Sequence, residues 1–338
     1  MDLATFWFVA LGVLLTGYAI LDGFDLGTGI LHLTAQTDTE RRHHLNAIGP
    51  LWDGNEVWLV TFGGALFAAF PAAYAAAFSG FYLPFMALLF GLIFRAVSIE
   101  FRSKVKGVRW RRAWDIAFCA ASTLTTFLFG VAVGNAMIGM AIDHLGVYRG
   151  TTLDLLGGFP LAVGLFAVVT FAMHGAIYLC LKTEGALQAR LRRIAWRAFF
   201  VFLCLYLGLS FYALRHVPSA TANFAHWPAL WVLVGLNALA VANIPRALSQ
   251  GRTAYAFISS CATIAALVAL FGAALFPNLV VSTLDPAWSL TVDNAASSQS
   301  TLHTMRTIAF IGLPFVLAYT GIIYWVFRGK VKLDDASY

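Results

Sequence analysis

Long apolar runs separated by short polar loops dominate the chain. A membrane-spanning helix needs about 20 mostly apolar residues, so each run predicts one span, about nine in all. The expected spans cover residues 4–33, 55–76, 79–101, 113–137, 158–182, 196–215, 228–246, 254–276 and 304–328. Within the first span, Gly23, Gly27 and Gly29 are expected to kink the helix or end it early, because glycine is a poor helix former. The pattern predicts an all-α polytopic membrane protein in which residues 1–338 form a single integral membrane domain.

Composition supports this fold class. The chain is 60% hydrophobic and 11% charged, with a mean hydropathy of +0.78, whereas soluble domains carry about 25% charged residues. All loops are short except the polar segment 277–303, so no separate soluble domain is expected. The four cysteines are scattered without metal-ligand spacing, which predicts small buried thiols rather than disulfides or a metal cluster.

The distribution of charge predicts the orientation. Most of the 22 Lys and Arg residues lie in alternate loops, beginning with Arg41 and Arg42 after the first span. Cytoplasmic loops are enriched in Lys and Arg, so the N-terminus should lie outside and the C-terminus in the cytoplasm. The start Met1-Asp2 lacks a basic region, so the first span is expected to be retained. The net charge of +6 is therefore attributed to membrane orientation, and no nucleic-acid partner is expected.

Ionisable residues lie inside the first three predicted spans or, in the case of Asp53, just before the second. Asp22 and Asp25 are three residues apart on one helical face, Asp53 and Glu56 repeat this spacing, and Arg95 lies in the third span. A charge within a span costs about 3 kcal/mol, so each is a functional candidate. All fall in the predicted cytoplasmic half. This asymmetry favours a pathway in which protons enter from the cytoplasm and pass to a partner protein. It argues against a proton path that crosses the whole membrane within this chain.

Each candidate has a simpler interpretation. Asp53 precedes Gly54 and is equally compatible with a helix N-cap, and Glu56 with a side chain facing headgroup water. Arg95 is expected to be a counter-ion for one of the carboxylates, with binding of a quinone or lipid headgroup as the alternative. Trp52 and Trp58 are expected to anchor the chain at the membrane interface, or else to stack on a ring. The lone deep His174 is expected to hydrogen-bond to a neighbouring helix rather than bind haem, because no second deep ligand accompanies it.

Several motifs together resemble subunit II of cytochrome bd-type quinol oxidases. The similarity is dense over residues 1–115, patchy over 116–280 and present again over 282–325. The motifs are Asp22–Gly29, Trp52–Trp58, Gly63–Ala68, Tyr74-Ala75, Phe94-Arg95, Phe101–Lys104 and segments of the loop 289–302.

The resemblance implies a nine-helix subunit, arranged as two four-helix bundles plus a peripheral helix, in a bacterial inner membrane. It implies pseudo-symmetric pairing with a haem-bearing subunit I, which carries haem b and haem d (or a further haem b) and where quinol and O2 react. Small accessory subunits are compatible with it. Subunit II would serve assembly and proton delivery, and would bind no haem itself.

The resemblance also assigns roles to single residues. Asp53 and Asp25 match the family's two buried carboxylates, and Arg95 matches its deep arginine. Some members bind a structural quinone near the tryptophan and arginine that match Trp52 and Arg95. Many members have Gln where this chain has Glu56, so Glu56 either helps to relay protons or takes over the role of Asp53.

The sequence therefore predicts the haem-free subunit of a quinol:oxygen oxidoreductase, with Asp22, Asp25, Asp53 and Glu56 on a proton pathway. A proton-coupled secondary transporter is the alternative from another class, because acids on glycine-interrupted helices suit one. The absence of a visible inverted repeat and the one-sided acids weigh against it. A third interpretation is an assembly scaffold whose acids are only structural.

Overall fold

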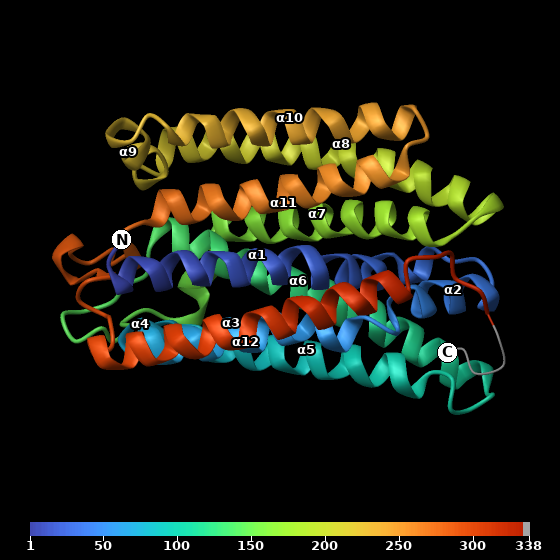
Figure 1. The fold of residues 1–338 in the computed structure, drawn as a ribbon, viewed down its shortest axis with the longest axis horizontal. Helices are drawn as coiled ribbons and strands as arrows, with labels where there is room; N and C mark the ends of the chain where they lie inside the picture. Colours follow the sequence, from blue (N-terminus) through green and yellow to red (C-terminus); the bar gives the residue numbers. More distant parts are fainter. Residues whose placement is uncertain (334–338) are drawn as a thin grey trace.

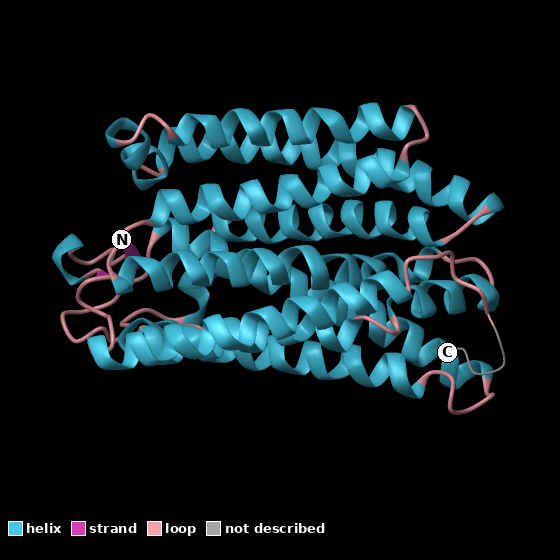
Figure 2. Cartoon of the chain, in the orientation of Figure 1, coloured by secondary structure: helices cyan, strands magenta, loops and turns pink. Residues whose placement is uncertain are grey.

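The computed structural model describes residues 1–333, and long helices lying nearly side by side make up most of it (Figures 1 and 2). The long helices are α1 (Leu3–Leu31), α3 (Trp52–Ala69), α5 (Tyr82–Phe101), α6 (Val108–Ile138), α7 (Gly158–Lys182), α8 (Gly185–His216), α10 (Leu230–Ser249), α11 (Thr253–Leu275) and α12 (Gln299–Val326). Shorter elements are the helices α2 (Asp38–Ile48), α4 (Pro71–Gly80) and α9 (Ser219–His226), the 3-10 turns η1 (His32–Thr34), η2 (Thr152–Leu156) and η3 (Pro286–Trp288), and the strands β1 (Asn278–Val280) and β2 (Leu290–Thr291).

The number of spans agrees with the sequence pattern. Eight of the described helices are long and apolar enough to cross a membrane, and the bent pair α3 and α4 makes a ninth if it is counted as one span. The protein is thus an all-α, multi-pass membrane protein. The paired strands β1 and β2 are antiparallel and belong to the long loop between α11 and α12.

The predicted second span, 55–76, is not one continuous helix. α3 ends at Ala69, and α4 begins at Pro71 after a bend of 120°. Proline disfavours the helical conformation in the residue before it, and Phe70 has φ −137° and ψ 64°. Ser297 of the long loop then binds the carbonyls that the break frees: its hydroxyl donates to Ala68 O (2.6 Å) and its N–H to Ala69 O (2.8 Å).

The glycines of the first span do not end it early, contrary to one of the two expected outcomes. α1 runs without a break to Leu31, and Gly27 and Gly29 instead allow neighbouring helices to approach. A Cβ on Gly27 would lie 1.9 Å from Phe171 O of α7, and one on Gly29 would lie 2.0 Å from Ser122 Oγ of α6. Small residues at such crossings are typical of helix packing in membranes.

Other bounds differ where polar segments extend apolar ones. α7 matches its predicted range 158–182, whereas α8 starts at Gly185 rather than at 196 and α6 at Val108 rather than at 113. Both additional segments are rich in arginine, so the apolar runs that predict the spans do not include them. They continue the helices beyond the apolar layer.

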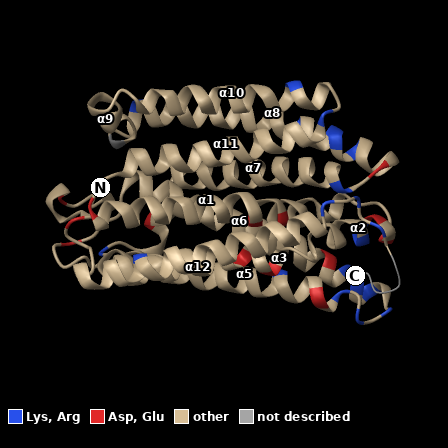
Figure 3. Ribbon diagram, in the orientation of Figure 1, with Lys and Arg blue, Asp and Glu red and all other residues tan. Residues whose placement is uncertain are grey.

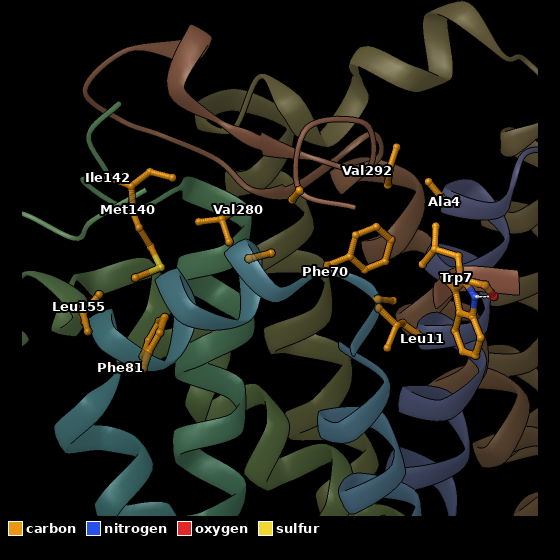
Figure 4. Close-up of a cluster of buried hydrophobic side chains, with 14 residues drawn as sticks. Ala4, Trp7, Leu11, Phe70, Phe81, Met140, Ile142, Leu155, Val280 and Val292 are labelled. Carbon is orange, nitrogen blue, oxygen red and sulfur yellow. Dashed lines mark hydrogen bonds between the residues drawn. The ribbon is translucent and has the colours of Figure 1, made fainter. Parts of the chain in front are cut away.

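Lys and Arg gather at the end of the bundle that carries α2 and the last described residues, here named the basic end (Figure 3). The N-terminus lies at the other end (Figure 1). There the long loop, α1 and the α3–α4 bend share a hydrophobic cluster that includes Trp7, Phe70 and Val280 (Figure 4). Trp7 Nε1 donates to Leu302 O across 3.0 Å. This cluster fixes how α1, α3 and α12 meet, and the candidate site lies between those helices and α5.

Candidate functional site

A buried ion cluster joins α1, α3 and α5. Arg95 is only 1% exposed, and its Nη1 donates to Asp22 Oδ1 across 2.6 Å, while its Nη2 donates to Glu56 Oε2 across 3.0 Å. Asp22 is fully buried and Glu56 is partly buried. The fold thus brings together three of the residues that the sequence singled out, and Arg95 is a counter-ion for two carboxylates.

Asp25 lies about one turn from Asp22 towards the basic end and has a different environment. Its Oδ2 accepts a hydrogen bond from Asn55 Nδ2 (2.7 Å), and the Asn55 amide oxygen accepts one from the Tyr324 hydroxyl of α12 (2.8 Å). Asp25 is 1% exposed, and among the ion pairs of residues 1–333 none involves it. Two acids therefore pair with the Arg95 guanidinium, and a third, Asp25, lies beside them without a charged partner. Because unpaired buried charge is costly, the group has the capacity to hold protons.

Asp53 does not join this cluster. It lies in the first turn of α3 and is exposed on the surface of the chain. The N-cap of α3 is Leu51, which makes no side-chain capping bond, so the N-cap interpretation of Asp53 is wrong. Trp52 is partly buried against a hydrophobic cluster that includes Leu51, and the Trp58 ring packs on Gly17 of α1.

His174 is hydrogen-bonded between helices, as expected. Its Nδ1 lies 2.7 Å from Ser260 Oγ of α11 and its Nε2 lies 3.0 Å from Ile20 O of α1. The ring stacks on Phe257, with centroids 5.0 Å apart. Both ring nitrogens are engaged, so neither is free to bind iron in this arrangement.

Sequence reasoning missed a second buried cluster at the basic end. Fully buried Asp115 of α6 accepts from Arg102 Nε (2.6 Å), lies 2.7 Å from His32 Nε2 and pairs with Arg41 (3.4 Å). Arg102 also donates to Asp38 (2.7 Å). Arg102 follows the predicted third span, which ends at residue 101, and it is only 1% exposed. The one indication of this cluster in the sequence is Asp115 itself, a single acid within an arginine-rich segment.

Asn55 and Tyr324 were also missed as site residues. Asn55 lies inside the motif that was singled out, whereas no pattern connects Tyr324 of α12 to α1. Only the fold brings the two together. Within residues 1–333, no group of three or more His, Cys, Asp or Glu side chains is arranged to hold a metal ion.

The comparisons with known proteins agree with the resemblance. A family profile described as "Cytochrome bd terminal oxidase subunit II" matches residues 3–327. The chain belongs to this family. It is 36% identical over 360 residues to "Cytochrome bd-I ubiquinol oxidase subunit 2" of Escherichia coli K12, covering 97% of this chain and 95% of that protein. It is 34% identical over 327 residues to "Cytochrome bd ubiquinol oxidase subunit 2" of Bacillus subtilis, covering 96% of each.

The fold agrees as well. The structure of bd oxidase from Geobacillus thermodenitrificans contains a chain that matches with a TM-score of 0.80 at 19% identity, covering 97% of this chain and 99% of that one. As a subunit II, the protein is one component of a membrane quinol oxidase and implies a subunit I partner. Membership in this family favours the oxidase over the transporter.

Proposed function

We propose that this chain is the haem-free subunit II of a quinol:oxygen oxidoreductase in a bacterial inner membrane, and that it helps to deliver cytoplasmic protons for reduction of O2 to water. Quinol and O2 react in a subunit I that holds haem b and haem d, or a further haem b. Each electron that reaches O2 must be matched by one proton. The observation that carries the proposal is the buried group Asp22, Asp25 and Glu56 around the single cation Arg95.

Asp25 is the central residue of the pathway. Asp22 and Glu56 are paired with Arg95, whereas the Asp25 carboxylate has only the neutral Asn55 amide. Gain or loss of a proton at Asp25 therefore breaks no ion pair. Glu56 is the least buried of the three and lies on α3, the helix that exposes Asp53, so it is suited to pass protons towards a partner that covers this helix.

The roles of Asp53, Trp52 and Arg95 are refined accordingly. Asp53 acts at the junction with subunit I, because its carboxylate is exposed on a membrane helix of this chain. Both terminal nitrogens of Arg95 already bind carboxylates in a buried site. This favours the counter-ion over the quinone or lipid headgroup as the role of Arg95, and it leaves Trp52 as an interface anchor.

The first test is Asp25→Asn in the complex purified through this chain. We expect O2 reduction and proton uptake to fall roughly 10-fold or more, because a positioned acid contributes on this scale to proton transfer. The haem absorbance should stay unchanged, since the amide keeps the shape of the side chain. The measurements are oxygen consumption, pH change in weakly buffered vesicles and the haem spectrum.

Asp293→Asn is the matched control, because Asp293 is an exposed carboxylate in the long loop, and it should leave all three measurements unchanged. Full rates in Asp25→Asn with full haem content would support the scaffold interpretation instead. A purified complex without haem absorbance would support the transporter.

A further inference from the structure

A line of buried polar atoms without protein hydrogen-bond partners runs along α1 and the facing side of α6, and reaches α2. Buried polar atoms in proteins are almost always paired with protein or with ordered water, so these positions mark internal hydration. They are Tyr18 Oη, Asp22 Oδ2, Asp25 Oδ1, Thr28 Oγ1, Ser122 Oγ, Thr125 Oγ1, His32 Nδ1 and both ring nitrogens of His44.

Helix geometry explains the line on α1. Positions 18, 22, 25, 29 and 32 follow alternating steps of four and three, so they share one face. At 1.5 Å per residue, Asp25 and His32 are about 10 Å apart along the axis. This face runs from the ion cluster towards the basic end, and a proton on Asp25 must cross that distance if it comes from the cytoplasm.

α6 supplies a hydroxyl in the middle of this interval. It runs antiparallel to α1, with Asp115 at the level of His32 (2.7 Å) and Phe129 at the level of Tyr18, where the ring centroids are 5.4 Å apart. Ser122 lies between these levels. A Cβ on Gly29 would be 2.0 Å from Ser122 Oγ, so the hydroxyl occupies the place of the missing side chain on the polar face. The absence of a side chain at Gly29 lets a hydroxyl stand between Asp25 and His32.

Two histidines continue the line at the basic end. Because Asp115 accepts the Nε2–H of His32, the unpartnered Nδ1 is free to accept a proton. The His44 ring of α2 lies 5.9 Å from the His32 ring between centroids, is fully buried, and has neither nitrogen bonded to protein. A separation of this size is suited to a bridging water. Burial lowers the pKa of His44 to about 3, so the ring is neutral near pH 7, with one donor and one acceptor nitrogen.

Charged groups from several elements lie near the two rings. The charges near His32 are Asp115, Arg102 and Arg41, and those near His44 are Glu40, Arg190 and the titratable His43. Asp115 is the charge in direct contact with His32, and it would stabilise a transient imidazolium there. The surrounding arginines oppose lasting occupation by a proton. The two effects together favour transfer of a proton through His32 over lasting retention of that proton there.

We propose that His44, His32 and Ser122, with ordered water between them, form the proton-entry relay that feeds Asp25 from the basic end. A proton from cytoplasmic water binds one nitrogen of His44 as the other releases one inward. His32 takes it transiently on Nδ1 and returns it to water, and the Ser122 hydroxyl accepts one proton as it donates another. One proton enters, one reaches the Asp25 carboxylate, and no atom changes oxidation state. The inference rests on the proposed function of Asp25.

Ser122→Ala in the whole complex tests the relay, because it removes one hydroxyl with little change in shape. We expect the O2-reduction rate to fall several-fold, with the haem spectrum unchanged. A slowed proton entry also changes the pH profile, so the deficit should grow as pH rises and the rate ratio in H2O over D2O should increase. A purely structural role for Ser122 predicts neither change.

Thr123→Ala is the matched control, since Thr123 is the next residue on α6 and its hydroxyl donates only to Cys119 O of its own helix (2.7 Å). It should leave the rate, the pH profile and the isotope ratio as in the unmodified complex. His44→Phe is the second relay variant and should reproduce the effect of Ser122→Ala. If His44→Phe fails to assemble, Ser122→Ala alone decides.

The outcomes separate this inference from the proposed function. Wild-type rates in Ser122→Ala and His44→Phe across the pH range, together with a large loss in Asp25→Asn, overturn the relay and leave the role of Asp25 intact. An unchanged rate in Asp25→Asn overturns the proposed function itself.

Discussion

Asp25 and Asp22 lie one turn apart on one helix, yet their partners differ in charge. Asp22 accepts from the Arg95 guanidinium and Asp25 from the Asn55 amide. Removing one partner of a buried ion pair is costly, so Asp22 and Arg95 are expected to stay paired. The partner of Asp25 is neutral, which is why we propose Asp25 as the central residue of proton uptake.

His44 provides a prediction on the stability of the folded protein. Its folded pKa of about 3 lies below the usual unfolded value of about 6.5. Between these values the unfolded chain binds the proton and the folded chain does not. The free energy of unfolding should therefore fall as pH drops below about 6.5, by about 1.4 kcal/mol per pH unit for this one group.

His44→Phe should remove that portion of the pH dependence. Thermal denaturation of the complex between about pH 5 and pH 7.5 measures it, with His226→Phe as the control, because His226 is exposed on α9. A curve with the same slope in His44→Phe as in the unmodified protein would contradict the burial of a neutral imidazole.

Predictions about single residues from the sequence succeeded where they depend on positions within one helix. The three-residue spacing of Asp22 and Asp25 fixed their common face, and a deep Arg95 demanded an acidic partner. They failed where the decisive neighbour comes from another helix. Asp115 is a single acid in an arginine-rich segment, and nothing in the sequence connects it to His32. Asp53 and Glu56 were both candidates for the proton pathway although only Glu56 reaches Arg95, because the sequence does not state which side of α3 meets α1.

At the scale of the helix, glycine placement decides which helices touch. Gly27 of α1 lies so close to α7 that a Cβ on Gly27 would be 1.9 Å from Phe171 O and 2.9 Å from Gly175 N. Gly27→Ala should force α1 and α7 apart. We expect a loss of several kcal/mol, comparable to overpacking a core, seen as a lower denaturation temperature and a lower yield of assembled complex.

Gly12→Ala on the same helix is the control, because nothing lies within 4 Å of a Cβ at Gly12. It should be neutral or slightly stabilising, since alanine is the better helix former. Equal losses in the two variants would show that helix propensity rather than contact with α7 governs α1.

Hydropathy predicted the helices well because the membrane requires long apolar runs, but it missed the break between α3 and α4. Phe70 and Ala72 are as apolar as the residues of a continuous span, so the average hydropathy of the segment does not reveal the bend. In the sequence, only Pro71 indicates a possible break at this position. Whether a proline kinks a helix or ends it depends on partners for the freed carbonyls, and here Ser297, far away in the sequence, supplies them.

At the scale of the whole molecule, apolar surface does not reveal the partner, because lipid and protein both cover it. α12 illustrates this, since Leu302 is its one fully buried residue. Asp53 is more informative. A carboxylate facing lipid is costly, and Asp53 is exposed on α3, so we expect another polypeptide to cover this helix. Subunit I is the implied partner.

Val60 therefore provides a test of where subunit I binds. It follows Asp53 by two helical turns, so it shares the Asp53 face of α3, and it is 70% exposed in this chain. A photoreactive amino acid at Val60 should cross-link to the haem-bearing chain in the assembled complex. The same group at Leu239 of α10, which is 69% exposed, should react with lipid instead. Cross-linking from Leu239 but not from Val60 would place subunit I on the opposite side, and Asp53 would then need a different partner to account for its charge.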